Sequence, residues 1–277
     1  MNNYSILVNT CDKFEDCWDP FFKLFSIYWP TYKGKIYLNT ELKDYSYPNL
    51  NIISLKVAES LQAGKILTWS ECLMSALNKV EGEVILYLQE DYFIKDYIKY
   101  DTIEQYSNLM HEYQDIHCIH LTDQAVVAEN KESNYKGLYP VIRKQRYRIS
   151  CQAALWRIDV LHSYLRRYEN AWQFEEFGSK RSTLAKHNFY VVDNKLVKLN
   201  EFEIIPYIFT GIIQGKWYEE VIPLFEKNNI HIDYSKRGFV KNAIKKSFMS
   251  RFKNKIMRQP IFLLNAVNLA IIKFLSK

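Results

Sequence analysis

The chain has 277 residues, of which 48% are apolar, with only 8 glycines and 7 prolines. This composition excludes a disordered or collagen-like chain and suits one α/β domain with an appendage, or two small domains. The formal net charge of +6 is uneven: residues 236–277 hold 11 lysines and arginines and no acid, whereas the rest holds 26 basic and 31 acidic residues, a net of −5. The acidic body argues against nucleic-acid binding, and the basic tail predicts an anionic partner.

The five cysteines are scattered along the chain, with no C-x-x-C pair and no zinc-ligand spacing with the six histidines. Free thiols of this kind are typical of a reducing compartment, so we expect a cytoplasmic protein. Residues 1–8 hold no basic segment or long apolar run, which predicts that no secretory signal is present. The 21 tyrosines, 16 phenylalanines and 6 tryptophans suit a surface that stacks on sugar or base rings and, equally, a tyrosine-rich core.

Strands and helices alternate over residues 1–125. Helical spacing of apolar residues predicts helices over 12–28, 68–80 and 102–113, and Thr68 with Glu71 forms a capping-box pattern at the start of the second. This βαβ order predicts an α/β fold, a mostly parallel sheet flanked by helices. Apolar runs predict its strands over 4–10, 35–39, 50–55, 83–89 and 117–121.

The pattern is less regular from residue 126 onward. The run from Gly211 to Trp217 lacks the spacing and the Ser/Thr of a P-loop, so we interpret it as a turn. The other elements that we expect are loops over 129–148 and 170–182, strands over 150–156, 187–199 and 202–209, and helices over 158–168 and 217–228.

Residues 240–277 form a basic amphipathic tail. We predict one or two helices broken near Pro260, because proline lacks an amide hydrogen and clashes in a helix interior. Residues 261–275 are apolar, but about 15 residues are too few to span a bilayer. The tail therefore lies either in a membrane interface, its cations meeting anionic headgroups, or against the body or a second subunit. We divide the chain into a domain over 1–239 and this tail.

The most informative segment runs from Val84 to Phe93. Its apolar run is continuous rather than alternating, which predicts a strand buried on both faces. Gln89, Glu90 and Asp91 follow at the carboxyl end, which is the edge where open α/β sheets bind ligands. We expect Glu90 and Asp91 to contact a ligand or a metal ion, and the alternative is a solvated strand end.

Four short motifs in this order resemble those of the GT-A nucleotide-sugar glycosyltransferases found in bacterial surface-polysaccharide clusters, over residues 4–239. They are residues 9–12 after the first strand, 63–65 with 69–71, 89–91 at the Asp-x-Asp position, and 172–176. The resemblance implies a GT-A, Rossmann-like fold. The donor site that it implies consists of Thr10, Cys11, Asp12, Lys65, Trp69, Glu90 and Asp91.

The resemblance also implies Mg²⁺ or Mn²⁺ at the donor diphosphate, with Asp91 as metal ligand. Gln89 departs from the family pattern, because it stands where the family has the first Asp of Asp-x-Asp. A neutral amide is a poorer ligand than a carboxylate for a hard divalent cation. Metal dependence therefore stays open, and Lys65 or Arg181 is the candidate cation to neutralise the diphosphate without a metal.

Many inverting members of this family place a general base where this chain has Glu175 and Glu176, and we slightly favour Glu176. Asp123, at the end of another predicted strand, is a second candidate for acid–base work. Trp172 is a candidate stacking platform for the acceptor, with a buried loop anchor as the alternative. Arg181 is a further candidate for acceptor binding.

The sequence thus predicts a glycosyltransferase that moves a sugar from a nucleotide-sugar donor to a saccharide or lipid-linked acceptor, with inversion, at the inner face of the membrane. Capsule, O-antigen or lipooligosaccharide synthesis is the process that the resemblance implies. Two other classes stay open: a non-catalytic scaffold on a degenerate transferase fold, which Gln89 favours, and a nucleotidyltransferase. The latter usually has a glycine-rich loop after its first strand, and residues 9–13 hold no glycine.

Overall fold

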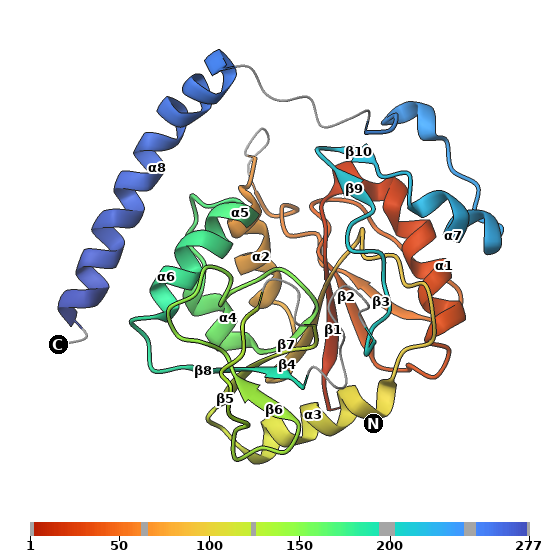
Figure 1. Cartoon of the computed structure of the whole chain (residues 1–277). Coiled ribbons are helices and arrows are strands. Elements are labelled where there is room, and N and C mark those ends of the chain that lie inside the picture. Colours follow the sequence, from red (N-terminus) through yellow and green to blue (C-terminus); the bar gives the residue numbers. More distant parts are fainter. Residues whose placement is uncertain (1–2, 62–65, 123–125, 194–202, 241–247, 276–277) are drawn as a thin grey trace.

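A computed structural model describes residues 3–61, 66–122, 126–193, 203–240 and 248–275. Its centre is an eight-stranded sheet of order β3-β2-β1-β4-β7-β5-β8-β6 (Figure 1). The strands are β1 (Ser5–Asn9), β2 (Lys35–Leu38), β3 (Asn51–Ser54), β4 (Val84–Gln89), β5 (Ile116–His120), β6 (Leu138–Pro140), β7 (Ala154–Arg157) and β8 (Asn188–Val192).

The sheet is mostly parallel, as the βαβ order predicts. β1 is parallel to β2 and β4, β2 is parallel to β3, and β5 is parallel to β8. β7 inserts antiparallel between β4 and β5, and β6 lies antiparallel at the edge. The α/β fold class is therefore confirmed, and the carboxyl ends of β1 and β4 lie at one edge of the sheet.

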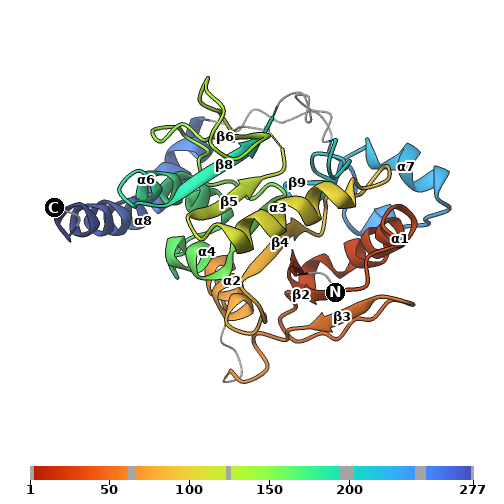
Figure 2. The ribbon, with the colours of Figure 1, turned by 90° about the horizontal axis from the view of Figure 1, so that it is seen from below.

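Helices cover both faces of the sheet (Figure 2). Successive residues of β4 point to opposite faces, and both faces are buried: Leu86 and Leu88 pack with one hydrophobic cluster, and Ile85 and Tyr87 with the other. This double burial explains the continuous apolar run of the strand. The first cluster includes α1 (Trp18–Tyr28), α3 (Tyr100–Glu112) and α7 (Val221–Lys227), and the second includes α2 (Trp69–Leu77) and α4 (Ile158–Tyr164).

Several short sequence patterns predict the local structure correctly. Thr68 caps α2: its hydroxyl accepts from the Glu71 amide at 3.1 Å, and the Glu71 carboxylate accepts from the Thr68 amide at 3.0 Å. The predicted helix over 12–28 begins as a 3₁₀ segment, Asp12–Cys17, before α1. The turn over 211–217 is also confirmed, since β9 (Ile212–Ile213) and β10 (Lys216–Trp217) form a small hairpin.

Three predictions for the second half were wrong. Residues 170–182 are helical rather than a loop, forming α5 (Ala171–Gln173), a π-helical segment (Phe174–Gly178) and α6 (Ser179–Ser182), because Asn170 and Gln173 make a capping box that the loop prediction overlooked. Residues 129–148 include β6. Residues 203–209 form an isolated bridge to residue 94 rather than a strand.

The part of the tail that the structure describes beyond residue 247 is one helix, α8 (Phe248–Leu275), which continues through Pro260. The predicted break was therefore wrong, because a proline inside a helix removes one hydrogen bond without necessarily ending the helix. α8 lies beside α6 (Figure 1). Within the described ranges, no helix has the length and apolarity that crossing a membrane requires.

A buried ion pair between Arg181 and Glu169 lies where α6 contacts α8. Arg181 is 2% exposed and donates to both carboxylate oxygens of Glu169, at 2.8 and 2.6 Å. Arg181 also donates to the Tyr164 carbonyl at 2.7 Å and to the side chain of Asn265 on α8 at 2.9 Å. One guanidinium therefore joins α4, α6 and α8.

We predict that Arg181→Met lowers the free energy of unfolding by about 3–5 kcal/mol, because it leaves the Glu169 carboxylate buried without its partner. Urea denaturation measures the change. Lys180→Met is the matched control, since Lys180 is half exposed in its pair with Glu176 and should cost less than about 1 kcal/mol. Equal stability of Arg181→Met and the wild type would contradict this role for the ion pair.

Candidate functional site

The ends of β1 and β4 bring two predicted motifs together. Asn9 and Gln89 are paired residues of the two parallel strands, so Thr10 and Glu90 each follow directly at the same edge. Polar side chains are buried at this edge: the Asn39 amide donates to the Asn9 side chain at 2.8 Å. Thr10 is also buried, and its hydroxyl accepts from the Trp18 indole at 2.9 Å.

Asp91 is buried and holds the β9–β10 hairpin. Its Oδ2 atom accepts from the Thr210 hydroxyl at 2.6 Å and from the Ile212 amide at 3.3 Å, and its carbonyl accepts from the Gly211 amide at 2.9 Å. A side chain at Gly211 would overlap the ring of Phe93, so only glycine fits there. The alternative of a solvated strand end therefore does not hold for Asp91. Its hydrogen bonds stabilise residues 210–212, whether or not it also binds a ligand.

The Glu90 carboxyl group is also buried. Burial, followed by the neighbouring charge of Asp91, raises the pKa of Glu90 well above its usual range, although Arg237 acts in the opposite direction. Burial likewise raises the pKa of Asp91, against the lowering effect of its hydrogen bonds to Thr210 and Ile212. Two adjacent buried acids that resist ionisation are a common feature of functional sites.

Arg237 lies close enough to this edge of the sheet for its charge to oppose the burial that raises the pKa of Glu90. Arg237 pairs with Asp16, with Nε–Oδ2 and Nη2–Oδ1 distances of 2.6 and 2.5 Å, and its guanidinium lies 4.5 Å from the ring centroid of Phe14. Arg237 is therefore already paired with a carboxylate other than Glu90 and Asp91. Sequence reasoning missed both Asp16 and Arg237, because 221 residues separate them and neither stands in a motif.

Gln89 has a structural use that a carboxylate could not fill. Its side-chain amide donates to the Cys151 carbonyl at 3.3 Å, and the Tyr92 hydroxyl donates to the same carbonyl at 2.8 Å. A carboxylate at residue 89 would have no proton to donate and would face a carbonyl oxygen. The departure from Asp-x-Asp therefore coincides with a link between β4 and residues 150–152.

Glu175 joins the same link from the other side. Its carboxylate accepts from the Cys151 amide at 2.8 Å, and burial raises its pKa. Burial also raises the pKa of Tyr87, in the middle of this region, and the charges of Glu90 and Glu175 add to that shift. Glu176, by contrast, is partly exposed and pairs with Lys180 at 2.9 Å. Of the two predicted bases, Glu175 is the one that accepts from residue 151, whose carbonyl accepts from Gln89 of β4.

The predicted donor residues near β1 are largely engaged in holding loops. The Asp12 carboxylate accepts from the amides of residues 41, 42 and 43 at 2.9, 2.9 and 3.2 Å. Burial, with Glu90 nearby, raises the pKa of the Cys11 thiol to about 11, so this thiol stays protonated at neutral pH. Trp69 is half-buried against Phe174, with ring centroids 5.5 Å apart.

Among the predicted ligand residues, Arg181 needs correction, and two others lie outside the described residues. Arg181 is buried in its ion pair with Glu169, so its guanidinium cannot reach a diphosphate or an acceptor. Trp172 is 74% exposed, which overturns the alternative of a buried anchor and leaves its ring free to stack. Lys65 and Asp123 fall in the ranges that the structure does not describe.

Glu90 and Asp91 are two buried carboxylates at this edge that could contribute to a metal site. Among the described residues, no three His, Cys, Asp or Glu side chains gather closely enough to hold a metal ion. Mg²⁺ is usually bound through one or two carboxylates, several waters and substrate phosphates. Glu90 and Asp91 fit that pattern, whereas Gln89 uses its amide group within the protein.

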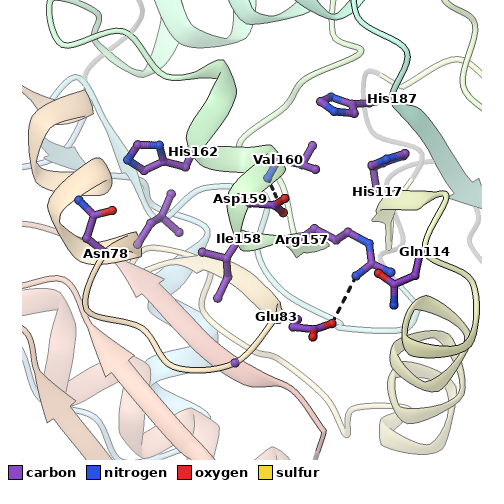
Figure 3. A pocket seen from close by; sticks show the side chains of 12 residues that line it. Asn78, Glu83, Gln114, His117, Arg157, Ile158, Asp159, Val160, His162 and His187 are labelled. Atoms are coloured by element: carbon purple, nitrogen blue, oxygen red, sulfur yellow. Dashed lines mark hydrogen bonds and ion pairs between the residues drawn. The ribbon is translucent and has the colours of Figure 1, made fainter.

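A separate cavity of about 730 Å³ opens at the opposite edge of the sheet, where β4 and β8 begin (Figure 3). His117 and His187 lie on one side of it with their rings 4.6 Å apart, and burial lowers the pKa of both. His162 lies on the other side (Figure 3). None of the predicted site residues within the described ranges lines this cavity, so we place the candidate site at the carboxyl edge.

The similarities of this chain to known proteins are weak. No family model and no curated protein matches the chain. A crystal structure of S. aureus TarS 1–349 is 12% identical with a TM-score of 0.42, covering 69% of this chain and 58% of that one. A second TarS structure has a TM-score of 0.43 and is covered over 35% of its length. Bifunctional IspDF from Campylobacter jejuni, also 12% identical, scores 0.29, and 44% of it is covered.

The chain therefore spans less than two thirds of each of these structures. Identities and scores this low carry no argument about activity, so the function has to be argued from the site itself.

The raised pKa of Glu90 predicts a pH dependence of stability. A carboxyl group whose pKa is higher in the folded state binds more protons folded than unfolded, so stability falls as pH rises above the unfolded value of about 4.5. Glu90→Gln removes this titration and should unfold at higher urea than the wild type at pH 8, with the difference shrinking towards pH 4. Parallel pH profiles of the two proteins would contradict the raised pKa of Glu90.

Proposed function

We propose that this protein is a glycosyltransferase that transfers a sugar from a nucleotide-sugar donor to a saccharide or lipid-linked saccharide acceptor, with inversion, in surface-polysaccharide synthesis. The observation that carries the proposal is the buried pair Glu90–Asp91 at the carboxyl end of β4, beside the end of β1. Ligands of open α/β sheets bind at this edge. The order of motifs along the chain supports the nucleotide-sugar donor.

Sugar transfer requires the site to neutralise the negative charge of the leaving diphosphate. Glu90 and Asp91 would hold Mg²⁺ or Mn²⁺ together with the donor phosphates, and the ion would neutralise the charge that develops on the leaving group. A bound cation would stabilise the ionised forms of Glu90 and Asp91, whose pKa values burial otherwise raises. Since Thr210 and Ile212 already bond to Asp91 Oδ2, the carboxylate of Asp91 is held in a fixed orientation.

Glu175 is the residue that we assign as general base. The Cys151 amide fixes its carboxylate at 2.8 Å, and burial raises its pKa. A carboxylate with a raised pKa accepts a proton from an acceptor hydroxyl more readily than a fully solvated one. The sequence alone slightly favours Glu176, but the Glu176 carboxylate pairs with Lys180 near the surface. The exposed ring of Trp172 offers a stacking surface for the acceptor.

A non-catalytic scaffold remains the competing candidate. Gln89 favours it, because the residue at the first Asp position is committed to the Cys151 carbonyl. Donor hydrolysis separates the two: a transferase slowly hydrolyses its nucleotide sugar when no acceptor is present, whereas a scaffold leaves the donor intact.

We predict that Glu175→Gln lowers the transfer rate roughly 100-fold or more, because it removes proton acceptance while keeping an oxygen for the Cys151 amide. Glu176→Gln is the matched control one residue along and should stay within about threefold of the wild type. Turnover under saturating donor and acceptor measures both. If Glu176→Gln loses the activity and Glu175→Gln keeps it, the base is Glu176 after all.

A further inference from the structure

Helix α8 faces the protein with polar side chains. Asn265 is fully buried, and its side-chain oxygen accepts from Arg181 at 2.9 Å. One turn further along, the side-chain oxygen of Asn268 accepts from Arg166 at 3.1 Å. Phe262 adds an edge contact with Phe177, with ring centroids 5.1 Å apart. These contacts fix which side of the helix meets the body.

The opposite side of α8 is apolar and exposed. Leu263, Val267, Ile271 and Phe274 recur at spacings of four, four and three, which places them along one side of a helix. Their exposed fractions are 68, 51, 52 and 79%. A helix on the surface of a globular protein normally does the reverse, burying its apolar side and exposing its polar side. A continuous exposed apolar stripe of this kind marks an interaction surface.

We propose that this stripe of α8 is a docking surface for an anionic lipid membrane. The helix is too short in apolar length to cross a bilayer, but an apolar side of this kind suits the boundary between headgroups and acyl chains. Because Asn265 and Asn268 bond to the rest of the protein, the apolar stripe on the opposite side of α8 faces away from it. The stripe is therefore accessible to a membrane.

Charge selects a membrane over a second copy of this chain. Residues 236–277 hold 11 cations and no acid, and nine of the cations precede Pro260. A second copy of this chain carries the same surplus of cations in its tail, whereas an anionic leaflet carries the opposite charge and attracts it. The proposal does not depend on sugar transfer: membrane docking is measured without donor or acceptor, so either proposal can fail alone.

The experiment uses the full chain and sedimentation with vesicles of phosphatidylcholine, with and without about one third phosphatidylglycerol. We expect binding to the anionic vesicles, weakened by salt, and much weaker binding to neutral ones. Val267→Glu should lower the binding constant at least about tenfold, because it places a charge in the apolar stripe. Val127→Glu is the matched control, since the two valines are 51 and 52% exposed and Val127 lies far from α8 in the sequence.

Three results would overturn the proposal. Wild-type protein that ignores anionic vesicles at low salt is one, and equal losses in Val267→Glu and Val127→Glu are another. The third is a dimer that Val267→Glu dissociates, with no vesicle binding, which would make a second copy the occupant. Unchanged thermal midpoints for both variants show that a loss of binding is not a loss of folding, as expected for exposed positions.

Discussion

Burial of the two carboxyl groups at the end of β4 is the constraint on which the rest of the site depends. Removing an acid from water is unfavourable unless it is protonated, hydrogen-bonded or paired. Asp91 is compensated by the hydroxyl and amide groups of residues 210 and 212, and Glu90 by a raised pKa. The proposed function gives this costly pair a use, because a bound cation would stabilise the ionised carboxylates.

The segment around Cys151 connects the two halves of the proposed site. Its carbonyl receives hydrogen bonds from Gln89 and Tyr92, and its amide donates to Glu175. The proposed metal-binding end of β4 and the proposed base thus share one short piece of backbone. A change at residue 89 would therefore move Glu175 as well, which gives a physical reason for glutamine where the family pattern has aspartate.

Local patterns predicted the fold well because each of them is set by neighbouring residues. The apolar run of β4 follows from burial on both faces, and the capping box of α2 needs only Thr68 and Glu71. Long-range partners were beyond such patterns. The residues next to Arg181 in the sequence do not indicate that Glu169 and Asn265 are its partners. The sequence therefore predicts a ligand contact for a cation that is buried and structural.

The tail shows the same limit. Its amphipathic spacing predicted a helix with two different sides, but the sequence alone could not tell which side meets the body. Asn265 and Asn268 decide this by bonding to Arg181 and Arg166, which lie 84 and 102 residues away from them in the sequence. The orientation that results is the reverse of the usual one, and only tertiary contacts establish it.

The most direct test of the account is calorimetric titration of the purified chain with a series of nucleotide sugars in the presence of Mg²⁺. The account predicts saturable binding of at least one nucleotide sugar, weakened at least about tenfold in Asp91→Asn, which keeps an acceptor for Thr210 but loses the charge. Absence of binding by every nucleotide sugar, or equal affinity in Asp91→Asn and the wild type, would contradict a donor site at the end of β4.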